Sequence, residues 1–189
     1  GVMDGRISGG TYDGYHWPVG VRLKNCTRCH VSGGVWGNCE ASVRHDGGES
    51  TRCKDCCILG NNFYADGLTT RAGADFPTAI YIYYGDESVI SSNTFRNLRS
   101  AVSGGNKGYG MGYAIYEGDG NCRALTIGNN TFVLETGDDY GMCGIYVTTC
   151  KNLTLQPNTF RWNSTNANSI PISVDLLAND STDPGGQRI

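Results

Sequence analysis

Short apolar segments recur along the chain, and six of them share one pattern. Each contains an aliphatic residue, a turn-forming residue three positions later and an aromatic residue five positions later. The segments are RISGGTY, HVSGGVW, CILGNNF, VISSNTF, TIGNNTF and TLQPNTF. Their aliphatic anchors are Ile7, Val31, Ile58, Ile90, Ile127 and Leu155, at separations of 24, 27, 32, 37 and 28 residues. Repeats of this length predict units that stack, because none can bury a core alone.

Two further columns follow once the anchors are aligned. The turn-forming column contains Gly10, Gly34, Asn61, Asn93, Asn130 and Asn158, and the aromatic column contains Tyr12, Trp36, Phe63, Phe95, Phe132 and Phe160. A second apolar segment follows in every unit, as GVRLK, ASVRH, AIYIY, AIYEG, GIYVT and ISVDL. Parallel strands stack at about 4.8 Å, so equivalent residues lie directly above one another. We therefore expect an asparagine ladder and an interior stack of rings.

These columns resemble the right-handed parallel β-helix of the pectate lyase and phage tailspike superfamily, whose interiors carry asparagine ladders and aromatic stacks. The resemblance implies an all-β, single-stranded solenoid of about six coils over residues 1–177. Residues 178–189 are expected to be a C-terminal tail or a truncated continuation. Neither end shows a polar cap, which favours a fragment of a longer chain, a homotrimer, or another assembly that covers the ends.

Composition narrows the classes of function. The 189 residues include 28 glycines and carry a formal net charge of -3, with basic residues scattered along the chain. This distribution provides no positive stripe for nucleic acid or an anionic membrane. No apolar run approaches the roughly 20 residues that span a bilayer. We expect neither a nucleic-acid partner nor a membrane partner.

Nine cysteines include two Cys-x-x-Cys pairs, in CTRCHVSGG and CKDCCILGN, which are typical of a zinc site. The alignment instead places them one coil apart, with Cys26 above Cys53 and Cys29 above Cys56. Cys122 and Cys150 recur in the first of these columns without a second cysteine three residues later. The pattern favours buried thiols as small apolar residues. Disulfides between adjacent coils and a metal remain the alternatives.

Candidate ligand-binding residues lie on the second apolar segment. Alternation points Ile80, Ile115 and Ile145 inward. Tyr81, Tyr116 and Tyr146 then form one outward column, with Tyr83 alongside. Exposed rings at coil spacing can hold successive sugar rings, and long segments before these strands would form one wall of a groove over coils three to five. The alternative is that the tyrosines pack under those segments or against a sister chain.

Carboxylates supply the candidate chemistry. Glu117 falls in an inward column with Leu23, Val43, Ile82, Val147 and Val174. A buried carboxylate needs a partner or a raised pKa, which makes Glu117 a candidate general acid; the alternative is that the strand ends early and Glu117 turns to solvent. Asp119, Asp138 and Asp139 lie nearby in sequence. Carboxyls on adjacent or alternate coils, about 5 or 10 Å apart, bracket the separations in retaining and inverting glycosidases.

Two family motifs are matched only in part. TIGNNTFVLETGDD looks like the Gly-Asp-Asp segment of polygalacturonases, but their Asn-Thr-Asp, Gly-His-Gly and Arg-Ile-Lys motifs are missing. Pectate lyases use calcium and an arginine base, and Arg71 near Asp66 and Asp75 could imitate that arrangement. We expect no cofactor, with calcium required only if the reaction is a lyase reaction.

These observations predict a protein of the cell exterior or virion surface that binds polysaccharide in a groove over coils three to five. The favoured version is a tailspike-type depolymerase that cleaves glycosidic bonds with a carboxylate pair from Glu117, Asp119, Asp138 and Asp139, and with Tyr81, Tyr83, Tyr116, Tyr146 and Arg71 holding substrate. The alternatives are a non-catalytic carbohydrate-binding adhesin and a structural spike or filament segment.

Overall fold

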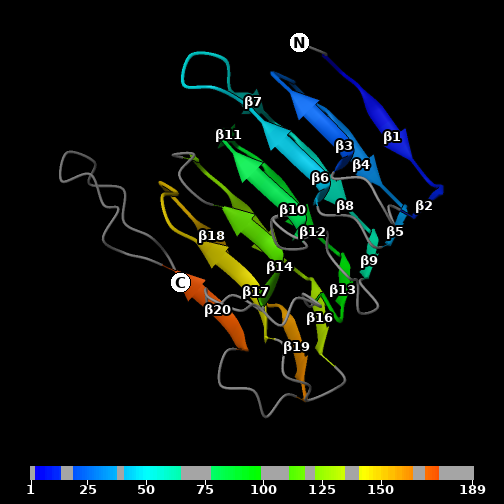
Figure 1. The fold of residues 1–189 in the computed structure, drawn as a ribbon. Helices are drawn as coiled ribbons and strands as arrows, with labels where there is room; N and C mark the ends of the chain where they lie inside the picture. The colour runs from blue at the N-terminus through cyan, green and yellow to red at the C-terminus, as the bar shows by residue number, and fades with distance from the viewer. Residues whose placement is uncertain are drawn as a thin grey trace, which may run out of the picture.

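The fold consists of stacked parallel β-sheets. The structure is a computed structural model that describes residues 3–13, 19–37, 41–64, 78–98, 111–117, 122–134, 141–163 and 169–174. Within these ranges all regular secondary structure is β. Three parallel sheets contain six strands each, and each repeat of the sequence contributes one strand to each of them. This all-β arrangement is compatible with a parallel β-helix (Figure 1).

The three sheets are named here by the residues they carry. The anchor sheet contains β1 (Arg6–Ser8), β4 (His30–Ser32), β8 (Cys57–Leu59), β12 (Val89–Ser91), β15 (Thr126–Gly128) and β18 (Thr154–Leu155). The ring sheet contains β2 (Thr11–Asp13), β5 (Val35–Gly37), β9 (Asn62–Tyr64), β13 (Thr94–Arg96), β16 (Thr131–Leu134) and β19 (Thr159–Trp162). The tyrosine sheet contains β3 (Val19–Lys24), β6 (Ala41–Asp46), β10 (Thr78–Tyr83), β14 (Met111–Glu117), β17 (Gly141–Val147) and β20 (Ile170–Val174). A short fourth sheet pairs β7 (Cys53–Lys54) with β11 (Gly85–Asp86).

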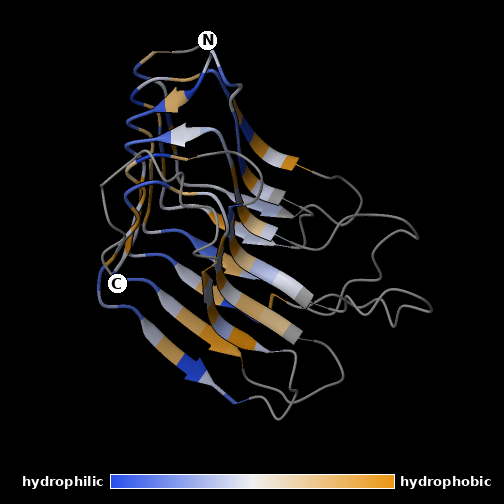
Figure 2. Ribbon diagram, turned by 90° about the vertical axis from the view of Figure 1, so that its left-hand side faces the viewer, coloured by the Kyte–Doolittle hydropathy of each residue, from blue (hydrophilic) through white to orange (hydrophobic). Residues whose placement is uncertain are grey.

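The register of the strands confirms the predicted columns. In the anchor sheet the paired residues are Ile7, Val31, Ile58, Ile90, Ile127 and Leu155. In the ring sheet they are Tyr12, Trp36, Phe63, Phe95, Phe132 and Phe160. Figure 2 shows the strands of successive repeats stacked in order. Equivalent positions of the sequence repeat therefore lie directly above one another.

A left-handed backbone corner precedes every strand of the anchor sheet. The residue three positions before each anchor has a φ between 50° and 59°, and these residues are Asp4, Arg28, Asp55, Glu87, Ala124 and Asn152. A left-handed residue other than glycine costs about 1 kcal/mol. Each corner amide also donates to the next repeat where the structure describes it, as Ala124 N does to the Lys151 carbonyl at 2.7 Å. These hydrogen bonds offset the strain and keep the anchor strands short.

The asparagine column forms a continuous hydrogen-bonded ladder. The Nδ2 of Asn61 donates to the Oδ1 of Asn93 at 3.1 Å, and Asn93 donates to Asn130 at 3.0 Å. Asn130 in turn donates to Asn158 at 3.1 Å. The backbone amide of each of the first three asparagines donates to the same acceptor oxygen. The ladder thus satisfies polar groups that burial would otherwise leave unpaired.

The cysteines line the interior, as the buried-thiol interpretation predicted. The structure holds Cys53, Cys56, Cys122, Cys143 and Cys150 as buried free thiols, and Cys57 as a half-buried one. The thiols of Cys26 and Cys29 donate to backbone carbonyls. Burial raises the pKa of the Cys56 and Cys150 thiols to about 12, so both stay neutral near pH 7. Cys39 lies outside the described residues.

Candidate functional site

The outer face of the tyrosine sheet carries a stack of three rings. Tyr81, Tyr116 and Tyr146 are paired in register on β10, β14 and β17. The centroids of Tyr81 and Tyr116 are 5.3 Å apart, and those of Tyr116 and Tyr146 are 5.1 Å apart with planes 5° from parallel. All three side chains are half-buried. The predicted outward column is therefore present, while its role in binding stays a prediction.

Two neighbours extend this stack. Tyr113 lies edge-on to Tyr116 and Tyr146, with centroid distances of 4.9 and 5.5 Å. The Cζ atom of Arg44 lies 5.0 Å from the centroid of Tyr81, within the range of a cation–π contact. The next position in register after Tyr146 is the small Ser173. The row thus begins at a guanidinium and continues through three stacked phenol rings, with the ring of Tyr113 edge-on beside them.

The orientation of the rings differs from the predicted platform. Because Tyr81, Tyr116 and Tyr146 stack face to face, each ring covers part of the face of the next. The row consequently does not present three open ring faces. Tyr83 does not share this geometry, since its ring lies edge-on to Tyr84 at a centroid distance of 4.7 Å. A ligand along the row would use hydroxyl hydrogen bonds as much as apolar contact.

Glu117 lies on the inner side of β14 and is 0% exposed. Its Oε2 accepts hydrogen bonds from the backbone amides of Thr148 at 3.0 Å and Thr149 at 2.9 Å. Its Oε1 accepts one from the Thr149 hydroxyl at 2.8 Å. The alternative in which Glu117 turns to solvent is therefore wrong. A carboxylate with both oxygens held in this way fastens the end of β14 to the next repeat, which is a structural role.

The inward column of Glu117 differs from the predicted one in the second repeat. Leu23 pairs with His45, not with Val43, and Val43 pairs with Val21. His45 in turn pairs with Ile82, the neighbour of Glu117. The sequence pattern failed here because a polar His45 resembles the end of a strand, although β6 continues through it. His45 is 0% exposed, and burial lowers its pKa to about 4.

Several predicted site residues lie outside the described residues. These are Asp119, Asp138, Asp139 and Arg71. Most of each long segment that was expected to wall the groove also lies outside them. The carboxylate pair and the arginine base therefore stay predictions. Within the described ranges, no group of three or more His, Cys, Asp or Glu side chains is arranged to hold a metal ion.

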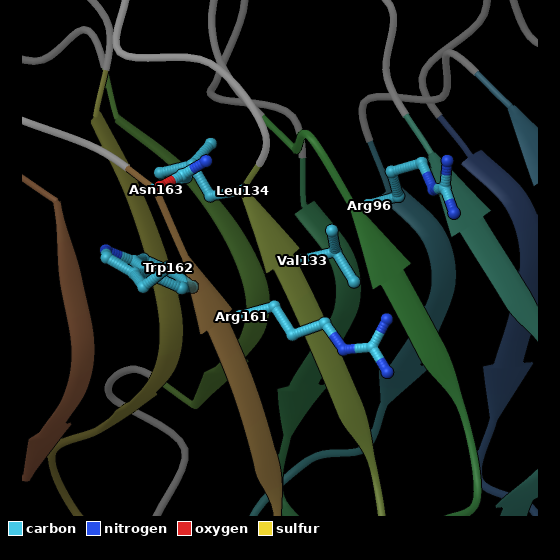
Figure 3. A pocket seen from close by; sticks show the side chains of 6 residues that line it. All are labelled: Arg96, Val133, Leu134, Arg161, Trp162 and Asn163. Carbon is cyan, nitrogen blue, oxygen red and sulfur yellow. The ribbon is translucent and has the colours of Figure 1, made fainter.

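A pocket that the sequence did not predict lies on the ring sheet. It has a volume of about 320 Å³ and is lined by Arg96, Val133, Leu134, Arg161, Trp162 and Asn163 (Figure 3). The available signal was the outward column of the ring sheet, in which arginine, valine and arginine follow one another in register. That column is difficult to recognise in the sequence because its three members are 37 and 28 residues apart.

Comparisons with known proteins leave the function to be argued from the structure. No protein-family model, curated protein or solved structure matches the chain. The part of the chain that the structure describes contains no helix with the length and apolar character needed to cross a bilayer.

Proposed function

We propose that this chain is a right-handed parallel β-helix that binds polysaccharide on the outer face of the tyrosine sheet, at the cell exterior or on a virion. One observation carries the proposal: Tyr81, Tyr116 and Tyr146 form a half-exposed stack in register, with neighbouring centroids 5.1–5.3 Å apart. A row with this repeat suits a linear ligand that presents similar groups at regular intervals. Polysaccharides are such ligands, and their hydroxyl groups and apolar ring faces match phenol groups.

The basic end of the row supports the same ligand class. Arg44 bonds to Asp46, with 3.7 Å between Nη2 and Oδ1, while its guanidinium covers the outer side of Tyr81. Guanidinium groups donate several hydrogen bonds in one plane, which suits vicinal sugar hydroxyls or an acidic substituent. The row therefore combines a fixed donor group with successive phenol groups over β6, β10, β14 and β17.

Removal of one ring tests the binding proposal. We expect Tyr116→Ala to weaken polysaccharide binding about tenfold, because the central ring touches both neighbours and any ligand that spans the row. Tyr12→Ala is the matched control, since Tyr12 is 36% exposed but lies on the ring sheet. Affinity gel electrophoresis against a panel of glycans measures both variants. Equal retardation of wild type, Tyr116→Ala and Tyr12→Ala would contradict the proposal.

Cleavage of the bound polysaccharide is a separate proposal that depends on Asp119, Asp138 and Asp139. Asp138→Asn and Asp139→Asn are expected to abolish release of reducing ends while leaving retardation unchanged. A carbon–carbon double bond in the product, detected by its ultraviolet absorbance, distinguishes elimination by a lyase from hydrolysis. Addition of a calcium chelator then tests whether the reaction needs calcium. If these acids can be replaced without loss of cleavage, the carboxylate-pair proposal is wrong. If the wild type cleaves no glycan, the protein is a binding module.

Glu117→Gln separates a structural role from a catalytic one. The amide nitrogen would face backbone and hydroxyl donors that now bond to a carboxylate. We expect a loss of about 2 kcal/mol in the free energy of unfolding, measured in urea, because a buried donor would lack an acceptor. A variant with unchanged stability and lost cleavage would restore Glu117 as a catalytic candidate.

A further inference from the structure

We propose a second binding site, in the pocket of about 320 Å³ on the outer face of the ring sheet, for a small ring-shaped organic carboxylate. The site is built by strands β13, β16 and β19, whereas the tyrosine row lies on β10, β14 and β17. It involves no residue of that row and does not depend on polysaccharide binding there.

The register of the strands creates the pocket. Arg96 pairs with Val133, and Val133 pairs with Arg161, so the two arginines lie two strands apart, or about 10 Å along the stack. Valine is much shorter than arginine and leaves a hollow between the two long side chains. In Figure 3 the Arg161 side chain reaches across β16 past Val133, and the Arg96 side chain extends in the same direction from β13. Two guanidinium groups therefore border one apolar hollow.

The charge of the site favours an anion. Arg96 and Arg161 are both exposed. An aspartate partner is present at Arg22, Arg28, Arg44 and Arg52. Arg96 also has an interaction within the protein. For Arg161, by contrast, the described ranges contain no carboxylate within ion-pair distance. A guanidinium matches the geometry of a carboxylate and binds it through two parallel hydrogen bonds, which a point charge cannot do.

The opposite wall favours a ligand with an apolar ring. Trp162 is half-buried, lines the pocket and pairs in register with the core residue Leu134. The indole of Trp162 is fixed by an edge contact with Phe160 at a centroid distance of 6.2 Å. In Figure 3 the nitrogen-bearing edge of Trp162 is directed away from Arg161, and the Arg161 guanidinium extends away from Trp162 across β16. Val133 and Leu134 also line the pocket but are only 7% and 1% exposed, so Trp162 presents most of the apolar surface.

Size restricts the ligand further. Pockets for drug-sized molecules range from about 300 to 1,000 Å³, so this one accommodates a single ring with its acidic substituent. Asn163, whose backbone amide donates to the Leu134 carbonyl at 2.9 Å, adds an amide at the rim that can bond to a ring hydroxyl. An acidic sugar and a free aromatic acid share this chemistry, and two probes distinguish them.

The test uses wild-type protein and two matched pairs of probes in isothermal titration calorimetry. Glucuronate is compared with glucose, and benzoate with benzamide, so that each pair differs mainly in the carboxylate. We expect at least one carboxylate to bind, its neutral counterpart to bind at least tenfold more weakly, and the affinity to fall as salt increases. Preference for glucuronate indicates an acidic sugar as ligand, and preference for benzoate indicates an aromatic acid.

Variants locate the binding in this pocket. Arg161→Gln is expected to weaken carboxylate binding about tenfold or more, and Arg161→Lys to recover only part of the loss because lysine cannot form the paired hydrogen bonds. Arg123→Gln is the matched control, since it removes the same charge from an exposed arginine outside the pocket. Thermal unfolding checks that all three variants are folded.

The proposal is overturned if neither carboxylate binds the wild type, or if the neutral probes bind equally well. It is also overturned if Arg123→Gln weakens binding as much as Arg161→Gln, because the effect would then reflect net charge alone. Polysaccharide binding at the tyrosine row is measured in parallel by gel retardation. The outcomes above decide whether the pocket binds a carboxylate, whether or not polysaccharide binds at the row.

Discussion

The molecule contains two aromatic stacks with similar spacing and opposite surroundings. In the inner stack, Phe95 lies 5.1 Å from Phe63 and 4.9 Å from Phe132, and all three are at most 1% exposed. In the outer stack, Tyr116 lies 5.3 Å from Tyr81 and 5.1 Å from Tyr146, and all three are half-buried. In-register parallel strands therefore produce a core at the ring sheet and a candidate ligand surface on the outer face of the tyrosine sheet.

What separates the two stacks is the amount of water that each ring loses on folding. The inner rings belong to the buried hydrophobic core, whereas the outer rings are half-buried. Burial of a complete aromatic side chain contributes more to stability than one partly exposed ring contact. Substitutions in the inner stack should consequently cause the larger loss of stability. Substitutions in the outer stack should mainly weaken ligand binding.

The largest expected effect comes from the inner stack. Phe95→Ala should lower the free energy of unfolding by about 3–5 kcal/mol, because it leaves a cavity between two rings that cannot close on each other. Thr94→Ala on the same strand, where Thr94 is half-buried, is the control. Urea denaturation measures both. Similar losses for the two variants would show that the inner stack contributes no more than an average strand position.

A smaller effect is expected from His45, which is buried on the inner side of the tyrosine sheet. The folded-state pKa of His45 is about 4, below its ordinary value of 6.5, so the unfolded chain binds the extra proton between these values. Stability is therefore full above pH 6.5 and falls as pH decreases toward 4, by up to about 3 kcal/mol. Urea unfolding between pH 4 and 7 measures the slope. His45→Leu, which matches its neighbours Leu23 and Ile82, should remove this part of it. An unchanged slope in that variant would contradict the assignment.

The smallest effect on stability is expected in the outer stack. Tyr116→Ala should cost only about 1 kcal/mol, the size of two cross-strand ring contacts on a partly exposed face. Tyr116→Phe keeps the ring and should cost less. Thermal and urea unfolding would show whether the binding loss of Tyr116→Ala is separate from its stability loss. A cost near that of Phe95→Ala would mean that the tyrosines form a second core under a covering segment.

Much of the fold could be predicted from the sequence because stacking repeats the same environment at the same position. One strand register accounts for the aliphatic anchors, the asparagines of the ladder and the rings five positions after each anchor. The prediction failed at His45, since alternation of apolar and polar residues cannot reveal a buried polar residue. Burial of six thiols was predictable for the same reason as the anchors, because these cysteines share their two columns with glycine, serine or leucine in other repeats. They are Cys26, Cys29, Cys53, Cys56, Cys122 and Cys150.

The candidate sites were less predictable. Register placed Tyr81, Tyr116 and Tyr146 in one row, but the tilt that covers their faces depends on side-chain torsions that the sequence pattern does not contain. The buried position of Glu117 depends on hydrogen-bond donors in the following repeat, the backbone amides of Thr148 and Thr149. The pocket beside Arg161 depends on the difference in side-chain length between neighbours in register, which becomes visible only after the strands are aligned.

The asparagine ladder also gives the molecule an electrical direction. Each side-chain amide points its Nδ2 toward the C-terminal repeats and its oxygen toward the N-terminal ones, so the amide dipoles add along the stack and strengthen one another. The oxygen end is closed at Asn61, whose Oδ1 accepts from the Gly34 amide and the Trp36 indole nitrogen. The nitrogen end is closed at Asn158, which donates to the Gln156 carbonyl. The two ends of this dipole row are chemically different. The oxygen end is closed inside the molecule by the second repeat, whereas a repeat added after Asn158 would have to bring an acceptor to continue the row.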